Sequence, residues 1–272
     1  MAQRLVTSAD GTVVSLESTG AGRPLVIVSG ALFASELWQR VVPLLAPGRR
    51  IEVLDRRGRG KSGDHAPYAP EREVEDLLAV VASLPAPADL LGHSSGAILA
   101  LQLAARAPRN LARLIVYEPP VFFAEPDCIA QDLPERLDAL LAAGQPEAAV
   151  ETFLREGPRA SEAELSSMRA GPAWRGMVQH LAHTVPYDSR VQRSYSADPA
   201  QLARIEIPTL MLLGGASPTR MRIAAETIAA RLPQVRLVEL PGQQHVAMLS
   251  AAPAFAAAVN EFLNTEPSVH NH

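Results

Sequence analysis

A strand, a sharp turn and a helix follow one another without a spacer over residues 89–107. An apolar run ends in the sequence Gly-His-Ser-Ser-Gly, and a stretch typical of a helix continues directly from it. A serine at the apex of such a turn has a strained backbone that tolerates only small neighbours, which Gly92 and Gly96 provide. The turn exposes the Ser94 hydroxyl above a sheet edge, beside helix N–H groups. We therefore predict that Ser94 is a nucleophile. The alternative is a glycine- and serine-rich turn without chemistry.

Strands and helices alternate along most of the remaining chain. Apolar or alternating runs predict further strands at 12–18, 24–28, 50–54, 114–117, 209–213 and 235–240. Helical spacing predicts helices at 35–45, 71–83, 221–232 and 253–263, the second with Val74, Leu77, Leu78 and Val81 toward the core. Such alternation is typical of a mostly parallel sheet with helices on both faces, so we predict fold class α/β.

Residues 119–207 interrupt this alternation. They contain no convincing strand, and prolines and glycines divide them into short helical stretches. We predict a helical cap at 119–207, inserted into a core domain formed by 1–118 and 208–264. The polar tail 265–272 is expected to be disordered.

Composition limits the partners of the chain. The 272 residues carry a net charge of −4, which favours neither nucleic acid nor an anionic membrane surface. No apolar stretch is long enough to span a bilayer, and the N-terminus lacks the core of a signal peptide. Cys128 is the only cysteine, which excludes an intrachain disulfide and a thiolate metal site, and we expect it to be inert. No nucleotide or metal motif is present either. We expect a cytoplasmic protein without cofactor, and we leave open whether it is a monomer or a homodimer.

A serine needs a base to accept its proton, and His245 is the best-placed histidine. It follows the last predicted strand, and the carboxyl ends of parallel strands meet at the edge where the turn presents Ser94. His93 lies inside the turn, so its side chain is expected to point away and pack. His65 is placed in a surface loop. The alternative for His245 is a polar loop residue without a catalytic role.

The third member of a triad is expected to be Glu118. The loop 214–220, which follows the next buried strand, contains no carboxylate. Glu118 stands one residue past the preceding apolar strand, on the same edge as Ser94 and His245. The order serine, acid, histidine along the chain is then the one that this architecture permits. The alternative is that Glu118 caps a helix or pairs with an arginine of the cap.

Two backbone N–H groups are needed to stabilise the oxyanion that forms when the serine attacks. The first is expected from Ser95, directly after the nucleophile. The second is expected from Ala31, in the loop after the strand at 24–28, with Leu32 as the runner-up.

Over residues 4–264 the chain resembles the α/β-hydrolase fold, and more narrowly the zearalenone-type lactone hydrolases. Glu118-Pro119, the loop without an acid at 215–219, and Leu240-Pro241-Gly242 with His245 carry this resemblance. It implies an eight-stranded sheet and a Ser94–Glu118–His245 triad with Ala31 and Ser95 in the oxyanion hole. It also implies that the arginine-rich turn at 55–62 is structural, and that Trp174 contacts substrate.

We therefore expect a serine hydrolase that cleaves a carboxylic ester or lactone of a small hydrophobic substrate through an acyl-enzyme. Its apolar pocket is expected to be lined by cap residues, namely Met168, Trp174, Met177, His180, His183 and Tyr187. Hydrolysis of a carbon–carbon bond, or another cofactor-free reaction such as that of a haloperoxidase or thioesterase, is the alternative within the enzymes. A catalytically weak ligand receptor or scaffold is the alternative of another class.

Overall fold

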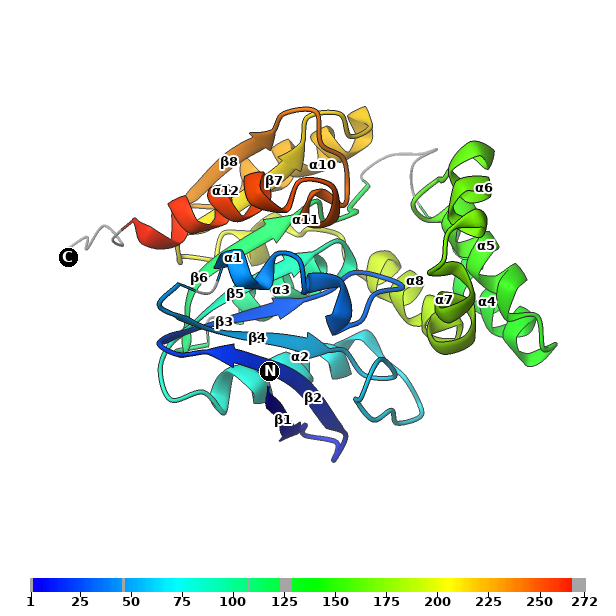
Figure 1. Ribbon diagram of the computed structural model, residues 1–272, viewed down its shortest axis with the longest axis horizontal. Coiled ribbons are helices and arrows are strands. Elements are labelled where there is room, and N and C mark those ends of the chain that lie inside the picture. The colour runs from blue at the N-terminus through cyan, green and yellow to red at the C-terminus, as the bar shows by residue number, and fades with distance from the viewer. Residues whose placement is uncertain (1, 46, 107, 123–128, 266–272) are drawn as a thin grey trace.

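Eight strands form one twisted sheet, in the order β1-β2-β4-β3-β5-β6-β7-β8 (Figure 1). The computed structural model describes residues 2–45, 47–106, 108–122 and 129–265, so Cys128 and residues 266–272 of the predicted tail lie outside it. The strands are β1 (Ala2–Thr7), β2 (Val13–Gly20), β3 (Arg23–Val28), β4 (Arg49–Asp55), β5 (Ala88–His93), β6 (Leu111–Tyr117), β7 (Thr209–Gly214) and β8 (Val235–Leu240). Strands β3 to β8 run parallel, whereas β1 and β2 pair in antiparallel fashion at one edge.

Helices cover both faces of this sheet, as predicted. One face packs against α2 (Pro70–Ala82), α3 (Ser95–Ala105) and α10 (Thr219–Ala229). The other packs against α1 (Val42–Leu45), α11 (Ala247–Ser250) and α12 (Ala252–Asn264). Successive residues of a strand point to opposite faces, so the central strands contribute apolar side chains to both layers. The predicted α/β fold class with a mostly parallel eight-stranded sheet is confirmed.

Three local predictions differ from the structure. Strand β1 was not anticipated, because only one of its six residues is buried. The helix predicted at 35–45 is a 3-10 turn, η1 (Ser35–Trp38), followed by the short α1. Leu78 is 39% exposed, because the buried face of α2 instead includes Glu73 and Asp76. These two carboxylates turn toward the arginines that follow β4.

The described part of the segment between β6 and β7 is helical. Its helices over residues 133–194 lie beyond the carboxyl ends of the parallel strands (Figure 1), whereas the short helix at 199–202 packs against α3 in the core. The helices of the segment are α4 (Leu133–Ala142), α5 (Pro146–Glu156), α6 (Glu162–Ala170), α7 (Trp174–Leu181), η2 (Ala182–Thr184), α8 (Val185–Ser194) and α9 (Pro199–Leu202). The segment's own apolar cluster also buries Leu32, from the loop after β3. None of the helices in the described part of the chain is long and apolar enough to cross a membrane.

Candidate active site

Ser94 occupies the strained turn between β5 and α3. Its φ angle is 55°, in the left-handed region that side chains other than glycine rarely adopt. A Cβ at Gly92 would lie 2.6 Å from Ala97 Cα, and one at Gly96 would lie 2.4 Å from the Ser29 carbonyl oxygen. Both positions therefore require glycine, as the motif predicts. The turn leaves Ser94 8% exposed.

Glu118 and His245 come together at the same edge. His245 Nδ1 lies 2.7 Å from Glu118 Oε2, and the carboxylate also accepts hydrogen bonds from Gly214 N at 2.7 Å and Ser217 Oγ at 2.5 Å. Burial raises the pKa of the Glu118 carboxyl, but the hydrogen bond and charge of His245, with those two donors, outweigh it and bring the pKa below its usual value. An ionised carboxylate can only accept, so Nδ1 carries the proton and Nε2 is free to act as a base.

The imidazole of His245 lies next to the nucleophile turn without a direct hydrogen bond to Ser94 Oγ among the described atoms. His93, the neighbour of Ser94, has its ring centre 4.7 Å from that of His245. His93 Nε2 is 2.9 Å from the His245 carbonyl oxygen, and because a carbonyl only accepts, Nε2 donates. Catalytic hydrogen bonds are often long or misaligned before substrate binds, so this arrangement is compatible with a serine–histidine pair.

His93 itself is completely buried and does not face solvent. Its ring stacks on Phe33 and lies edge-on to Trp38, as expected for a packing residue. Burial, and secondarily the nearby His245, keep the pKa of His93 well below its ordinary value. A neutral His93 thus ties the loop of His245 to the nucleophile turn.

The loop after β3 packs directly behind Ser94. A Cβ at Gly30 would lie 2.6 Å from Ser94 Cβ, so the loop approaches the turn as closely as a glycine allows. The amide N–H groups of Ala31, Leu32 and Ser95 donate to no acceptor among the described residues. Leu32 has a φ of 58° and Glu118 a φ of 48°, so strained backbone marks the ends of β3, β5 and β6 alike.

The predicted pocket residues have varied surroundings. The indole of Trp174 is buried in the apolar cluster of the inserted helices, and its N–H donates to Glu147 at 2.7 Å. Met177 is half-buried at the border of this cluster, and His180 is exposed on the same helix.

His183 and Tyr187 contact the loop after β4. His183 Nε2 lies 2.8 Å from the Gly58 carbonyl oxygen, and the Tyr187 hydroxyl donates to Asp64 at 2.8 Å. The Tyr187 ring stacks on Tyr68 at 3.8 Å. These two residues fasten the inserted helices to the core.

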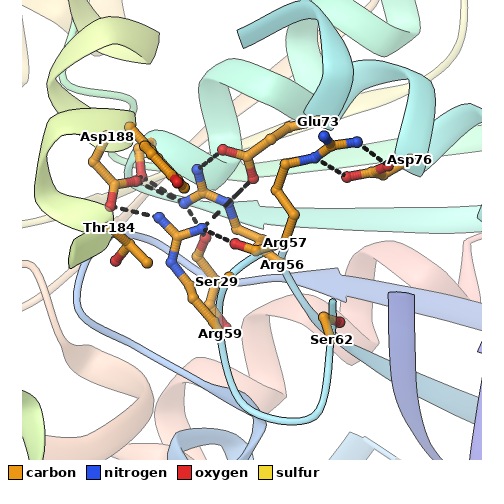
Figure 2. A network of polar contacts seen from close by, with 12 residues as sticks. Ser29, Arg56, Arg57, Arg59, Ser62, Glu73, Asp76, Thr184 and Asp188 are labelled. Carbon is orange, nitrogen blue, oxygen red and sulfur yellow. Dashed lines mark hydrogen bonds and ion pairs between the residues drawn. The ribbon is translucent and has the colours of Figure 1, made fainter. Parts of the chain in front are cut away.

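A buried ion cluster, which the sequence did not lead us to expect, lies beside the nucleophile turn (Figure 2). Arg56 pairs with Glu73 at 2.6 Å and with Asp188 of α8 at 2.8 Å. Arg59 pairs with the same Asp188 at 2.7 Å. Burial raises the pKa of Asp188, but the charges of Arg59 and Arg56 and the Ser95 hydrogen bond outweigh it and lower the pKa below the ordinary value. The three arginines of the turn were the available signal, because so many cations in one short turn require carboxylates nearby.

No group of three or more histidine, cysteine, aspartate or glutamate side chains that could hold a metal occurs among the residues that the structure describes.

Comparisons with known proteins agree on one family. The model of the alpha/beta hydrolase family matches residues 25–258. A pimeloyl-acyl-carrier-protein methyl ester esterase of Edwardsiella ictaluri (strain 93-146) is 27% identical over 253 residues, which cover 89% of this chain and 94% of that protein. The crystal structure of an alpha/beta hydrolase from Sphaerobacter thermophilus DSM 20745 is 40% identical with a TM-score of 0.89, over 96% of this chain and 100% of that one. A hydrolase from Pseudomonas aeruginosa PA01 is 28% identical with a TM-score of 0.80, over 97% and 98%.

Proposed function

Because the chain belongs to the alpha/beta hydrolase family, we propose that it is a serine hydrolase that cleaves carboxylic esters or lactones. The contact of 2.7 Å between His245 Nδ1 and the buried Glu118 carboxylate carries this proposal, since it orients the imidazole beside a strained serine. The methyl ester esterase among the relatives adds support for ester cleavage. Lactones are included in the proposal because Glu118, the proposed acid, follows β6. This is the position of the acid in the zearalenone-type lactone hydrolases, whose motifs the sequence resembles.

In the proposed mechanism His245 Nε2 removes the proton of Ser94 as the hydroxyl oxygen attacks the substrate carbonyl. The amides of Ser95 and Ala31, with Leu32 as the alternative to Ala31, stabilise the oxyanion. His245 then protonates the leaving alkoxide, and the acyl group remains on Ser94. Water activated by the same imidazole releases the acid and restores the serine. Glu118 stays ionised and stabilises the imidazolium in both steps.

We further propose that the inserted helices form a cap over this site, with the core provided by residues 1–118 and 208–264. The apolar cluster of the inserted helices reaches Leu32, so an apolar wall stands beside the loop that holds the proposed second oxyanion donor. A wall of this kind suits a small hydrophobic acyl or alcohol group. Met177 and His180 stay in the proposal as substrate contacts. Trp174, His183 and Tyr187 would take part only if their present partners were exchanged for substrate.

The first test is Ser94→Ala with p-nitrophenyl butyrate and with a macrolactone as substrates. We expect ester turnover to fall to background while the thermal unfolding curve is unchanged, because only one oxygen is removed. Ser167→Ala, at an exposed serine of α6, is the matched control and should retain full activity. Wild-type turnover in Ser94→Ala would overturn the proposal.

A second test asks whether Glu118 orients His245. Glu118→Gln keeps the shape of the side chain but removes the charge that stabilises the imidazolium, and we expect kcat to fall by about 10⁴-fold, as for other triad acids. Retention of most of the rate would show that another group orients the imidazole.

A fluorophosphonate, which reacts with activated serines, separates the alternatives. Labelling of Ser94, located by mass spectrometry, without turnover of any ester or lactone would favour the ligand receptor or scaffold. Labelling together with turnover of a carbon–carbon substrate alone would favour that alternative reaction.

A further inference from the structure

The buried ion cluster of Figure 2 reaches the two backbone segments that would hold the oxyanion. Arg56 Nη1 donates to Ser95 Oγ at 3.0 Å and to the Ser29 carbonyl oxygen at 3.3 Å. Ser95 Oγ in turn donates to Asp188 Oδ1 at 2.7 Å. Ser95 carries one proposed donor on its own amide, and Ser29 lies two residues before Ala31, which carries the other. One guanidinium nitrogen therefore contacts both segments.

Stability alone is a poor explanation for this cluster. Arg56, Arg59, Glu73 and Asp188 are all buried, and their charges sum to zero. Removing four charges from water costs several kcal/mol for each ion, and replacing buried ion pairs by apolar side chains is often neutral or stabilising. Apolar contacts could therefore dock α8 equally well, but they lack the direction of a hydrogen bond.

The direction of these hydrogen bonds matters at Ser95. The residue is the first of α3, so its N–H group has no acceptor within the helix. The carbonyl oxygen of Ser94, in the same peptide group, accepts hydrogen bonds from Ala97 N at 2.8 Å and Ile98 N at 3.3 Å, which restrain that group from within the helix. The hydroxyl of Ser95, held between Asp188 and Arg56, is the contact that restrains this residue from the side of the inserted helices.

We propose that Asp188 and Arg56 are positioning residues, which hold Ser95 so that its amide points at the oxyanion. This inference rests on the proposed function and adds a coupling to it. Asp188 belongs to the inserted segment, whereas Ser95 and Arg56 belong to the core, so the oxyanion site is complete only when α8 is docked. The inserted helices therefore have to be docked on the core before the oxyanion site can support acyl transfer.

Ser95→Ala is the cleanest test, because it removes the hydroxyl and leaves the ion pairs of Asp188 with Arg56 and Arg59 in place. A displaced donor should matter mainly in the tetrahedral state. We expect kcat for p-nitrophenyl butyrate to fall about tenfold with KM within about twofold, less than the ~100-fold loss when a donor is removed outright. Phenylboronic acid, which forms a tetrahedral adduct with the serine, should bind about tenfold more weakly, in parallel with kcat.

Two further variants separate positioning from general damage. Ser189→Ala removes a neighbouring buried hydroxyl of α8, which has no hydrogen-bond partner among the described residues, and should leave kcat and boronate affinity unchanged. Ser95→Cys replaces the hydroxyl by a weak donor, so its kcat should fall between those of the wild type and Ser95→Ala.

The outcomes are distinct. If the wild type hydrolyses esters and its Ser94 is labelled by a fluorophosphonate, but Ser95→Ala has wild-type kcat and boronate affinity, the positioning role is overturned and the proposed function stands. Equal loss in Ser95→Ala and Ser189→Ala would also overturn it, because it would indicate a general packing effect. A wild type that neither turns over nor is labelled would overturn both.

Discussion

Two buried aspartates, Asp89 and Asp188, each form ion pairs with two arginines. Asp89 lies at the amino ends of the parallel strands, whereas Asp188 lies near their carboxyl ends. Asp89 is near the start of β5, where Arg49 approaches it at 2.7 Å and Arg23 at 3.1 Å. Asp188 lies on α8 near the carboxyl edge, with Arg56 at 2.8 Å and Arg59 at 2.7 Å. Each aspartate therefore has two arginine partners, but Glu73 shares the arginines of Asp188, and the surroundings of the two clusters differ.

The surroundings change the electrostatics. The side chain of Arg23 is 36% exposed, whereas that of Arg56 is 1% exposed. Burial raises the pKa of Asp89, and its arginines do not overcome this, whereas Arg59 and Arg56 bring the pKa of Asp188 below its ordinary value. Arg49 also donates to the Leu263 carbonyl oxygen at 2.8 Å and so fastens the end of α12. The comparison indicates that the cluster of Asp89 stabilises the fold, whereas the cluster of Asp188 contacts the proposed active site.

The largest effect is expected for Asp188→Asn. This change leaves two buried arginines with Glu73 as their remaining carboxylate, and breaking a buried ion pair costs about 3–5 kcal/mol of unfolding free energy. The kcat of the folded fraction should also fall at least about tenfold, because a neutral amide holds the Ser95 hydroxyl and Arg56 less firmly than the carboxylate does. Urea unfolding and steady-state kinetics below the transition measure the two effects separately. Loss of stability with an unchanged kcat would show that the cluster of Asp188 has no role in catalysis.

A smaller loss is expected for Asp89→Asn, the matched change at the opposite edge. Arg23 is partly exposed to water, and Arg49 keeps its hydrogen bond to the Leu263 carbonyl oxygen, so we expect a loss of about 1–3 kcal/mol of unfolding free energy. The kcat of the folded protein should stay within about twofold, because the substitution is far from the reacting atoms along the strand. A loss of kcat as large as that in Asp188→Asn would contradict the division between the edges.

The sequence places the three residues of the proposed triad after strands, but it does not identify the partners in the ion cluster, because the contacts of that cluster join distant parts of the chain. Ser94 and Glu118 directly follow apolar strands, and His245 lies in the loop after β8, so a local pattern places each of them at the carboxyl ends of the parallel strands. Asp188 stands 132 positions after Arg56 in the chain, and nothing in its own short helix indicates that partner.

Long-range contacts also explain why the buried face of α2 was predicted wrongly and why β1 was not predicted. Apolar spacing alone predicts that Leu78 is buried. In the structure Glu73 and Asp76 lie on the buried face, where they pair with arginines, and Leu78 is exposed. Strand β1 is held by pairing with β2 rather than by burial, so its side chains carry little signal.

The pH dependence of stability gives the smallest and sharpest contrast. The pKa of Asp188 is lowered in the folded state, so its stabilisation is complete above the ordinary value of 3.8 and is lost only below it. The pKa of Asp89 is raised in the folded state. As the pH falls toward 3.8, Asp89 therefore takes up its proton in the folded state before it does so in the unfolded state. Protonation of Asp89 therefore offsets part of the acid loss that other carboxylates cause.

Asp89→Asn removes this offset, and the fall of unfolding free energy with acid should become steeper at pH values just above 4, by up to about 1.4 kcal/mol per pH unit. Asp188→Asn should keep the wild-type slope there and flatten it only at lower pH. Urea titrations between pH 4 and 7, with Glu206→Gln at an exposed loop position as the control, measure these slopes. Because each slope is compared within one variant, the different overall stabilities do not enter. Equal slopes for Asp89→Asn and Asp188→Asn would mean that the two clusters share one electrostatic character, and the contrast between the edges would then rest on position alone.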